Sequence, residues 1–219
     1  MLYFGGGGSA SSTITGDISN LSGLALTEMF IDNTAISGNI SVLAGFTGMG
    51  SFGLRHDVDN PNLTGDIASI AALTSITTFS LQSASNVTGN ISTVISALTS
   101  LVIFNINNTG ISGDISAARN LSGLVSVRAY GTSVSFESST AWSINLANAF
   151  IYDCNWTSQE VDNCVIALSN MAFAAGNNSV KIAGNNAART AVSDAADALM
   201  ESKVETYEVN EEAATAATV

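Results

Sequence analysis

The hydrophobic pattern of the chain repeats. Pairs of apolar residues two positions apart recur at intervals of 22 to 31 residues. This spacing predicts short β-strands with one buried face. Most pairs are followed by a glycine-containing return, and the sequences GDIS, GNIS, GDIA, GNIS and GDIS begin at Gly16, Gly38, Gly65, Gly89 and Gly113. One such unit cannot bury its apolar side alone, so the pattern predicts stacked units that form a solenoid.

Seven predicted strands align on this pattern. When the second apolar residue of each pair is taken as the reference, the reference positions are Ile31, Leu54, Leu81, Ile106, Ala129, Ile151 and Ile182. Their partners, two residues earlier, are Met29, Phe52, Phe79, Phe104, Val127, Ala149 and Val180. The alignment predicts that these residues point into the core from neighbouring parallel strands.

The segment LTSLVIFNINNTGISGDI, residues 98–115, resembles the plant-type leucine-rich-repeat pattern LxxLxxLxLxxNxLxGxIP. Gly113 and Ile115 match its G-x-I, whereas serine or alanine, as at Ser116 and Ala68, replaces the final proline. The resemblance covers roughly residues 14–190. It implies an α/β repeat fold with a parallel β-sheet on the concave face, a mostly irregular convex side, and helices in the C-terminal coils.

The two ends of the chain depart from this repeat. Leu2 and Phe4 have strand spacing, which predicts a first strand before the glycines at 5–8, with a flexible tail as the alternative. Helical periodicity over 158–175 and 193–203 predicts two helices, capped by Thr157 or Ser158 and by Ser193. The expected divisions are 1–13 (N-terminal strand and Gly-rich segment), 14–157 (leucine-rich-repeat solenoid), 158–210 (helix-containing C-terminal repeats and cap) and 211–219 (acidic, alanine-containing tail).

Composition narrows the classes of function. Charged residues make up 11% of the chain, against about 25% in typical globular proteins. The net charge of −12 argues against nucleic-acid binding, which needs a basic face. The first residues lack the basic and apolar regions of a signal peptide, and no apolar run approaches the ~20 residues of a membrane span. We therefore expect no membrane insertion and a protein that works in an assembly or outside a cell.

Residues suited to catalysis or metal binding are few. His56 is the only histidine, it is expected to be exposed, and no G-x-S-x-G nucleophile motif is present. Carboxylates recur in the G-D-I turns, but asparagine replaces them in other repeats, which favours a turn-forming role over calcium binding. These residues are Asp17, Asp66 and Asp114, with Asn39 and Asn90 in the equivalent places. The sequence thus predicts a non-enzymatic protein without cofactor or metal.

Cys154 and Cys164 are the only cysteines. Cys154 falls at an inward turn position and Cys164 near the apolar side of the first predicted helix. Two buried free thiols are the prediction, and a disulfide across the strand–helix junction is the alternative.

The C-terminal sequence, beginning NWTSQEVD at Asn155, resembles the C-terminal part of repeat proteins encoded by bacteriophages. That resemblance implies a virion component in a decoration layer, spike or tail fibre. The implied partners are other virion proteins, further copies of the chain and a host-surface protein or glycan. The alternative is a bacterial secreted or cell-surface leucine-rich-repeat adhesin or protein-binding module.

Ligand contacts are expected on the concave face. Residues that alternate with the buried strand positions point outward there, and exposed aromatic rings beside Arg and Asn are typical of contact surfaces. An ordinary solvated sheet is the alternative. The candidate contacts are Phe30, Arg55, Gln82, Asn105, Asn107, Arg128, Tyr130, Phe150, Tyr152 and Lys181.

Overall fold

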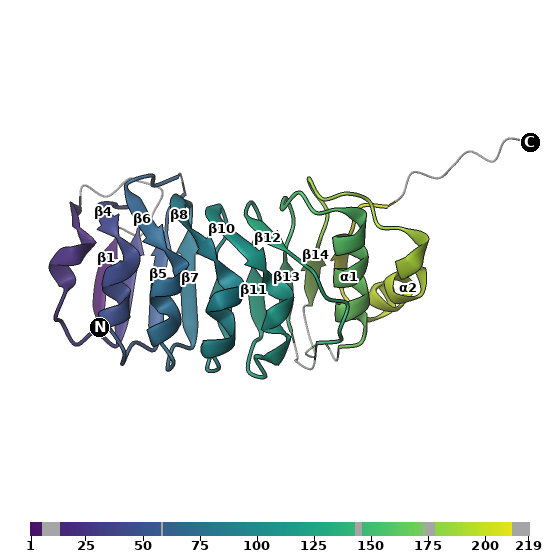
Figure 1. Ribbon diagram of the computed structural model, residues 1–219, viewed down its shortest axis with the longest axis horizontal. Helices are drawn as coiled ribbons and strands as arrows, with labels where there is room; N and C mark the ends of the chain where they lie inside the picture. The colour runs from purple at the N-terminus through teal and green to yellow at the C-terminus, as the bar shows by residue number, and fades with distance from the viewer. Residues whose placement is uncertain (6–13, 58, 143–145, 172, 174–177, 212–219) are drawn as a thin grey trace, which may run out of the picture.

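The computed structural model describes residues 1–5, 14–57, 59–142, 146–171, 173 and 178–211. These residues form an elongated solenoid, with the N-terminus at one end and two α-helices at the other (Figure 1). Most of the predicted glycine-rich segment, the tail from residue 212 and the end of the helix predicted over 158–175 lie outside the described residues.

A parallel sheet forms one long side of the solenoid. Within the described residues it has nine strands, one per coil, whose spatial order follows the chain: β1 (Leu2–Gly5), β3 (Glu28–Asp32), β5 (Ser51–Arg55), β7 (Thr78–Gln82), β9 (Ile103–Asn105), β11 (Ser126–Arg128), β13 (Asn148–Phe150), β14 (Ser179–Lys181) and β15 (Thr206–Glu208). The predicted register is confirmed, since Phe52 pairs with Phe79 and Phe79 with Phe104. Leu2–Gly5 pairs with β3, so a strand precedes the first full repeat.

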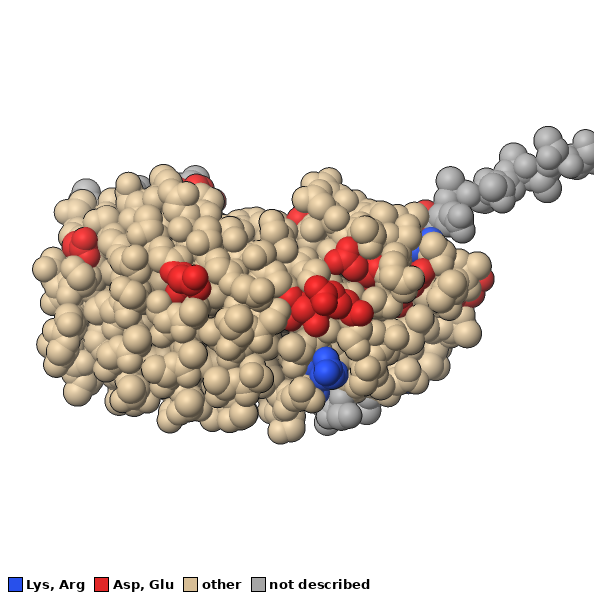
Figure 2. Space-filling model, in the orientation of Figure 1, with Lys and Arg blue, Asp and Glu red and all other residues tan. Residues whose placement is uncertain are grey.

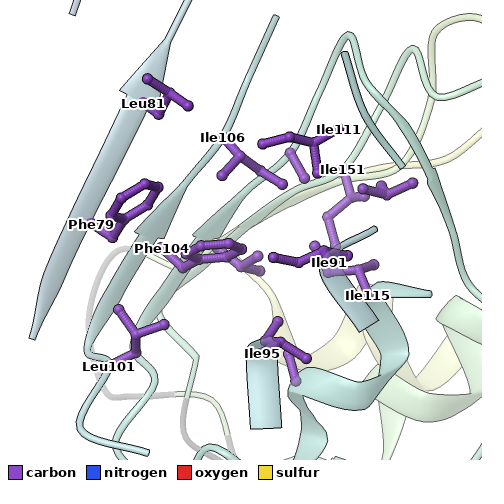
Figure 3. Packing of buried hydrophobic residues seen from close by; sticks show 14 of the residues in the cluster. Phe79, Leu81, Ile91, Ile95, Leu101, Phe104, Ile106, Ile111, Ile115 and Ile151 are labelled. Atoms are coloured by element: carbon purple, nitrogen blue, oxygen red, sulfur yellow. The ribbon is translucent and has the colours of Figure 1, made fainter. Parts of the chain in front are cut away.

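The core lies between this sheet and the returning segments. Phe52, Phe79 and Phe104 stack along the solenoid, with ring centroids 5.3 and 6.0 Å apart. Figure 3 shows Phe104 and Ile106 on the sheet side, opposite Ile91 and Ile115 from the returning segments. Each coil therefore buries its apolar side against its neighbours, as the repeat pattern predicts.

The returning side is more regular than the mostly irregular convex side that the repeat resemblance implied. It holds a second parallel sheet, which in the described chain has six strands: β2 (Thr15–Asp17), β4 (Ala35–Asn39), β6 (Leu63–Asp66), β8 (Ala84–Asn90), β10 (Thr109–Asp114) and β12 (Ser133–Ser135). Short 3-10 helices follow the first five of them: η1 (Ile18–Leu21), η2 (Ile40–Gly45), η3 (Ile67–Ala72), η4 (Ile91–Thr93) with η5 (Ile95–Ala97), and η6 (Ile115–Asn120).

The regular structure of the returning side depends on the Asp or Asn of each G-D/N-I turn. Its side-chain oxygen accepts a hydrogen bond from the backbone N–H two residues later, as Asp66 does from Ala68 at 2.8 Å, and thereby caps the 3-10 helix. Either residue can supply that oxygen, so the predicted turn-forming role is confirmed. The glycine before it has a positive φ, +108° at Gly89, and a Cβ there would lie 2.2 Å from Asp66 Oδ1 of the preceding coil. Glycine thus permits both the turn and the close stacking of coils.

The last coils use helices instead. α1 (Ser158–Ser169) begins with a capping box formed by Thr157 and Glu160, which confirms Thr157 as a cap. η7 (Ala191–Ser193) leads into α2 (Asp194–Lys203). Ser193 is at the predicted N-cap position, but its hydroxyl donates to the buried Asp162 at 2.6 Å and makes no cap bond. The buried carboxylate therefore binds the segment before α2 to α1.

His56 is buried, which corrects the prediction of an exposed histidine. It is 3% exposed, because it continues the inward alternation of Phe52 and Leu54 into the loop between β5 and β6. Its Nε2 lies 3.3 Å from Asn60 Nδ2, which also donates to the Ile36 carbonyl at 3.0 Å. Burial lowers the pKa of His56 and outweighs the opposing effect of nearby carboxylates.

Cys154 and Cys164 are buried free thiols, as predicted. Cys154 Sγ lies 3.3 Å from the carbonyl oxygen of Ala129, to which it donates. Burial raises the pKa of Cys154 to about 11 and raises that of Cys164 as well, so neither thiol is a reactive thiolate at neutral pH.

Candidate functional site

The concave sheet presents a row of outward-facing residues at one level. Backbone pairing places Phe30, Gly53, Ser80, Asn105, Arg128, Phe150 and Lys181 on successive strands from β3 to β14. In this row, small or short side chains on β5, β7 and β9 lie between Phe30 and Arg128. The row is therefore low in the middle and raised at both sides.

The low part of the row belongs to a groove of about 770 Å³, called here the concave groove. It is lined by Tyr3, Phe30, Asp32, Gly53, Arg55, Thr78, Ser80, Gln82, Val102, Ile103, Asn105, Val125, Ser126, Arg128 and Asn148. Ser80 is 9% exposed and Asn105 is 8% exposed. Ser80 Oγ and Asn105 Oδ1 have no hydrogen-bond partner within the described residues. Buried polar atoms are normally paired, so the floor of the groove holds two unsatisfied polar atoms.

An aromatic and cationic patch adjoins the groove on β11, β13, β14 and the residues that directly follow β11 and β13. Tyr130 and Tyr152 stack with their ring centroids 4.6 Å apart and their planes at 6°. The Arg128 guanidinium lies 5.1 Å from the Phe150 ring centroid, and Lys181 Nζ lies 4.7 Å from that of Tyr152. These contacts order long side chains before any partner arrives, which lowers the entropy lost on binding.

Basic and acidic side chains lie side by side on this face. Of the six Lys and Arg residues, all of which the structure describes, Arg55, Arg128 and Lys181 lie here. Lys181 pairs with Glu208 at 3.0 Å, and that hydrogen bond raises the lysine pKa. Arg55 approaches Asp32 at 3.4 Å while its side chain remains 63% exposed. Figure 2 shows one face of the molecule, on which uncharged side chains cover most of the area and acidic groups outnumber basic ones.

The predicted contact residues fall into two groups and one exception. Phe30, Arg55, Gln82, Asn105 and Arg128 line the concave groove. Tyr130, Phe150, Tyr152 and Lys181 form the adjoining patch.

Asn107 is the exception. It is 1% exposed, so it offers no accessible surface, contrary to the prediction. Tyrosines occupy the equivalent position in the next two coils, Tyr130 and Tyr152.

The sequence-based prediction missed the apolar rim of the groove. Ile103 and Val125 are 41% and 40% exposed, and both line the groove beside Val102. Ile103 lies one position before the inward-facing Phe104, so strand alternation alone predicts that its side chain points outward. The apolar side chain gave no reason to expect a surface position.

Two other findings concern the described residues. They contain no group of three or more His, Cys, Asp or Glu side chains placed to hold a metal ion. None of their helices has both the length and the apolar character needed to cross a membrane.

Comparison with known proteins identifies the fold. No protein-family model matches the chain, and no curated protein sequence is significantly similar to it. Among solved structures, the leucine-rich-repeat ectodomain of the membrane receptor kinase GASSHO1/SCHENGEN3 from Arabidopsis thaliana, solved in complex with CASPARIAN STRIP INTEGRITY FACTOR 2, has a TM-score of 0.51 and 16% identity over 81% of this chain. Internalin C2 from Listeria monocytogenes has a TM-score of 0.49 and 19% identity over 85% of this chain.

The chain spans only part of these proteins, 21% of the receptor ectodomain and 65% of internalin C2. At these identities the likeness concerns the fold alone. The chain is a leucine-rich-repeat solenoid with C-terminal helices.

Proposed function

We propose that the chain is a non-enzymatic recognition module that binds a protein partner on its concave face, with the concave groove at the centre of the contact. The observation that carries the proposal is the pair of buried, unpartnered atoms, Ser80 Oγ and Asn105 Oδ1, at the groove floor. Leaving a buried polar atom unpaired costs about 1–3 kcal/mol. A partner removes this cost if the two side chains rotate toward the groove and accept its hydrogen bonds.

The adjoining patch supports the same conclusion. Tyrosine and arginine are enriched in protein interfaces because they combine large apolar area with directed hydrogen bonds. Tyr130, Tyr152 and Arg128 are already held by ring and cation contacts. They are therefore suited to act as anchors in a protein contact.

The setting inferred from the sequence is a bacteriophage virion, in which the partners are neighbouring virion subunits or a host-surface protein or glycan. The alternative setting is the surface or exterior of a bacterial cell. Neither similar structure reported above is a virion protein, so the virion setting rests on the sequence resemblance alone. Mass spectrometry of purified particles and of washed cell-surface fractions distinguishes the two settings. Absence of the chain from particles, with recovery from cell surfaces, would reject the virion setting.

The binding proposal is tested by single alanine substitutions at Arg128, Tyr130 and Tyr152. Arg119→Ala, on the 3-10 helix η6 of the opposite side, is the matched control. Each purified variant is immobilised and incubated with the particles or cell envelopes in which mass spectrometry finds the chain, and the retained amount is compared with wild type. At least one concave-face variant should retain several-fold less than the control. Equal retention by all four folded variants would refute binding on the concave face.

A further inference from the structure

The floor of the concave groove is uncharged and built from short side chains. Gly53, Ser80 and Asn105 are neighbours across β5, β7 and β9, and the Phe30 ring leans over Gly53, where an added Cβ would lie 2.7 Å from the ring. Ser80 and Asn105 offer a hydroxyl and an amide oxygen without partners in the described chain. Such a floor fits a ligand with regularly spaced hydrogen-bonding groups and a slender backbone.

Two arginines lie at opposite ends of the groove, and Asp32 lines it beside Arg55. Arg55 ends β5 and Arg128 ends β11, three strand steps away. Since Arg128 pairs with Asn105 and Arg55 with Gln82, the two arginines also differ by two residues along the strand direction. Strand geometry places their backbones about 16 Å apart. Arg128 has no ion pair within the described residues, and the nearest carboxylate to Arg55 is only loosely engaged at 3.4 Å.

The rim adds an apolar element. Ile103 and Val125 are exposed along one edge of the groove, and Tyr3, 52% exposed, lies at its N-terminal end. Exposed aliphatic side chains gain free energy by covering the apolar side chains of a peptide. Sugars and polyphosphates carry few groups of that kind. The rim therefore favours a polypeptide over an anionic polysaccharide.

Building on the proposed function, we propose that the concave groove binds an extended acidic peptide segment of the partner. Two carboxylates about five residues apart contact Arg55 and Arg128, because an extended chain covers about 16 Å in five residues. The intervening backbone bonds to Ser80 and Asn105, and apolar side chains of the segment cover Ile103 and Val125. The net charge of −12 repels an acidic segment from most of the molecule, so its binding depends on the contacts with Arg55 and Arg128.

The test uses an array of synthetic seven-residue peptides with Leu and Ser backgrounds. Two Asp residues are placed one to five positions apart, and a matched set carries Lys at the same positions. Wild type, Arg55→Gln, Arg128→Gln and the control Arg119→Gln are compared, together with Ser80→Phe, which fills the groove. Circular dichroism verifies that each variant is folded, and Gln82→Trp replaces Ser80→Phe as the blocking variant if the latter does not fold.

We expect the widest Asp spacings to bind best and the Lys peptides not to bind. Each glutamine substitution in the groove should weaken binding by about tenfold, the control should not, and the blocking variant should abolish it. Acid-independent binding that Ser80→Phe abolishes would overturn the acidic-peptide inference but leave the proposed function standing. Binding by both glutamine variants as tight as that of wild type, or binding of heparin and polygalacturonate in place of the peptides, would also overturn it. If wild type binds none of the peptides and the alanine substitutions at Arg128, Tyr130 and Tyr152 do not weaken retention, both the acidic-peptide inference and the proposed function are overturned.

Discussion

Gly89 offers a sharp test of how the coils are held together. Its φ of +108° is accessible to glycine and strained for other residues. An added Cβ would lie 2.2 Å from Asp66 Oδ1, which caps η3 in the preceding coil through the Ala68 N–H. Alanine at this position must therefore strain the backbone and displace the cap as well. Gly16 holds the same motif position with φ +140°, yet nothing lies within 4 Å of its added Cβ.

The two effects have separate magnitudes. Backbone strain at such φ values costs about 1–3 kcal/mol, and loss of a capping side chain costs about 1 kcal/mol. Gly16→Ala should therefore destabilise by about 1–3 kcal/mol. Gly89→Ala should lower the free energy of unfolding by about 1 kcal/mol more than Gly16→Ala does. Asp66→Ala removes the obstructing side chain and the cap together, so its combination with Gly89→Ala should cost about 1 kcal/mol less than the sum of the two single changes.

The assay is urea unfolding followed by circular dichroism, with the four variants and wild type measured at one protein concentration. The urea midpoint should be highest for wild type, lower for Gly16→Ala and lowest for Gly89→Ala. Equal losses for the two glycine variants would show that stacking of Asp66 against Gly89 does not matter. Strict additivity of Gly89→Ala and Asp66→Ala would refute the coupling directly.

Three further predictions follow from the burial and edge geometry. The pKa of His56 is lowered by burial, so the unfolded state binds more protons as the pH falls below its ordinary value of 6.5. The stability provided by neutral His56 is thus present above pH 6.5 and lost below it, and His56→Gln should reduce the difference in urea midpoint between pH 7 and pH 5; an unchanged difference would contradict this. Cys154 and Cys164 should react slowly with a thiol reagent in the native protein, and unfolding should make two thiols reactive. A peptide map under non-reducing conditions that shows the two cysteines linked by a disulfide would refute this prediction. Deleting residues 1–8 removes β1 and should abolish any self-association through that sheet edge while the remaining coils melt cooperatively; light scattering that shows the same oligomer before and after deletion would exclude this edge as the contact.

The strands and their register were predictable from sequence because each coil repeats the same two-residue alternation. Phe52, Phe79 and Phe104 align in the sequence, and they stack in the structure. The turn-forming role of Asp66 and its equivalents was also predictable, since Asp and Asn exchange freely there and share one useful oxygen. The second sheet on the returning side was not predicted, because it forms through backbone hydrogen bonds between neighbouring coils, which the alternation within one coil does not specify.

The sequence by itself determined which face of each strand is outward, and so placed Phe30, Arg55, Gln82, Asn105, Arg128, Tyr130, Phe150, Tyr152 and Lys181 on the concave face. Only the tertiary structure decided how deeply each side chain is buried. It buried Asn107 and His56, joined Ser80 and Asn105 into one groove, and exposed Ile103 at its rim. The physical reason is that direction depends on local strand alternation, whereas burial depends on the size of side chains on neighbouring coils about 4.8 Å away, which are more than 20 residues distant in the chain.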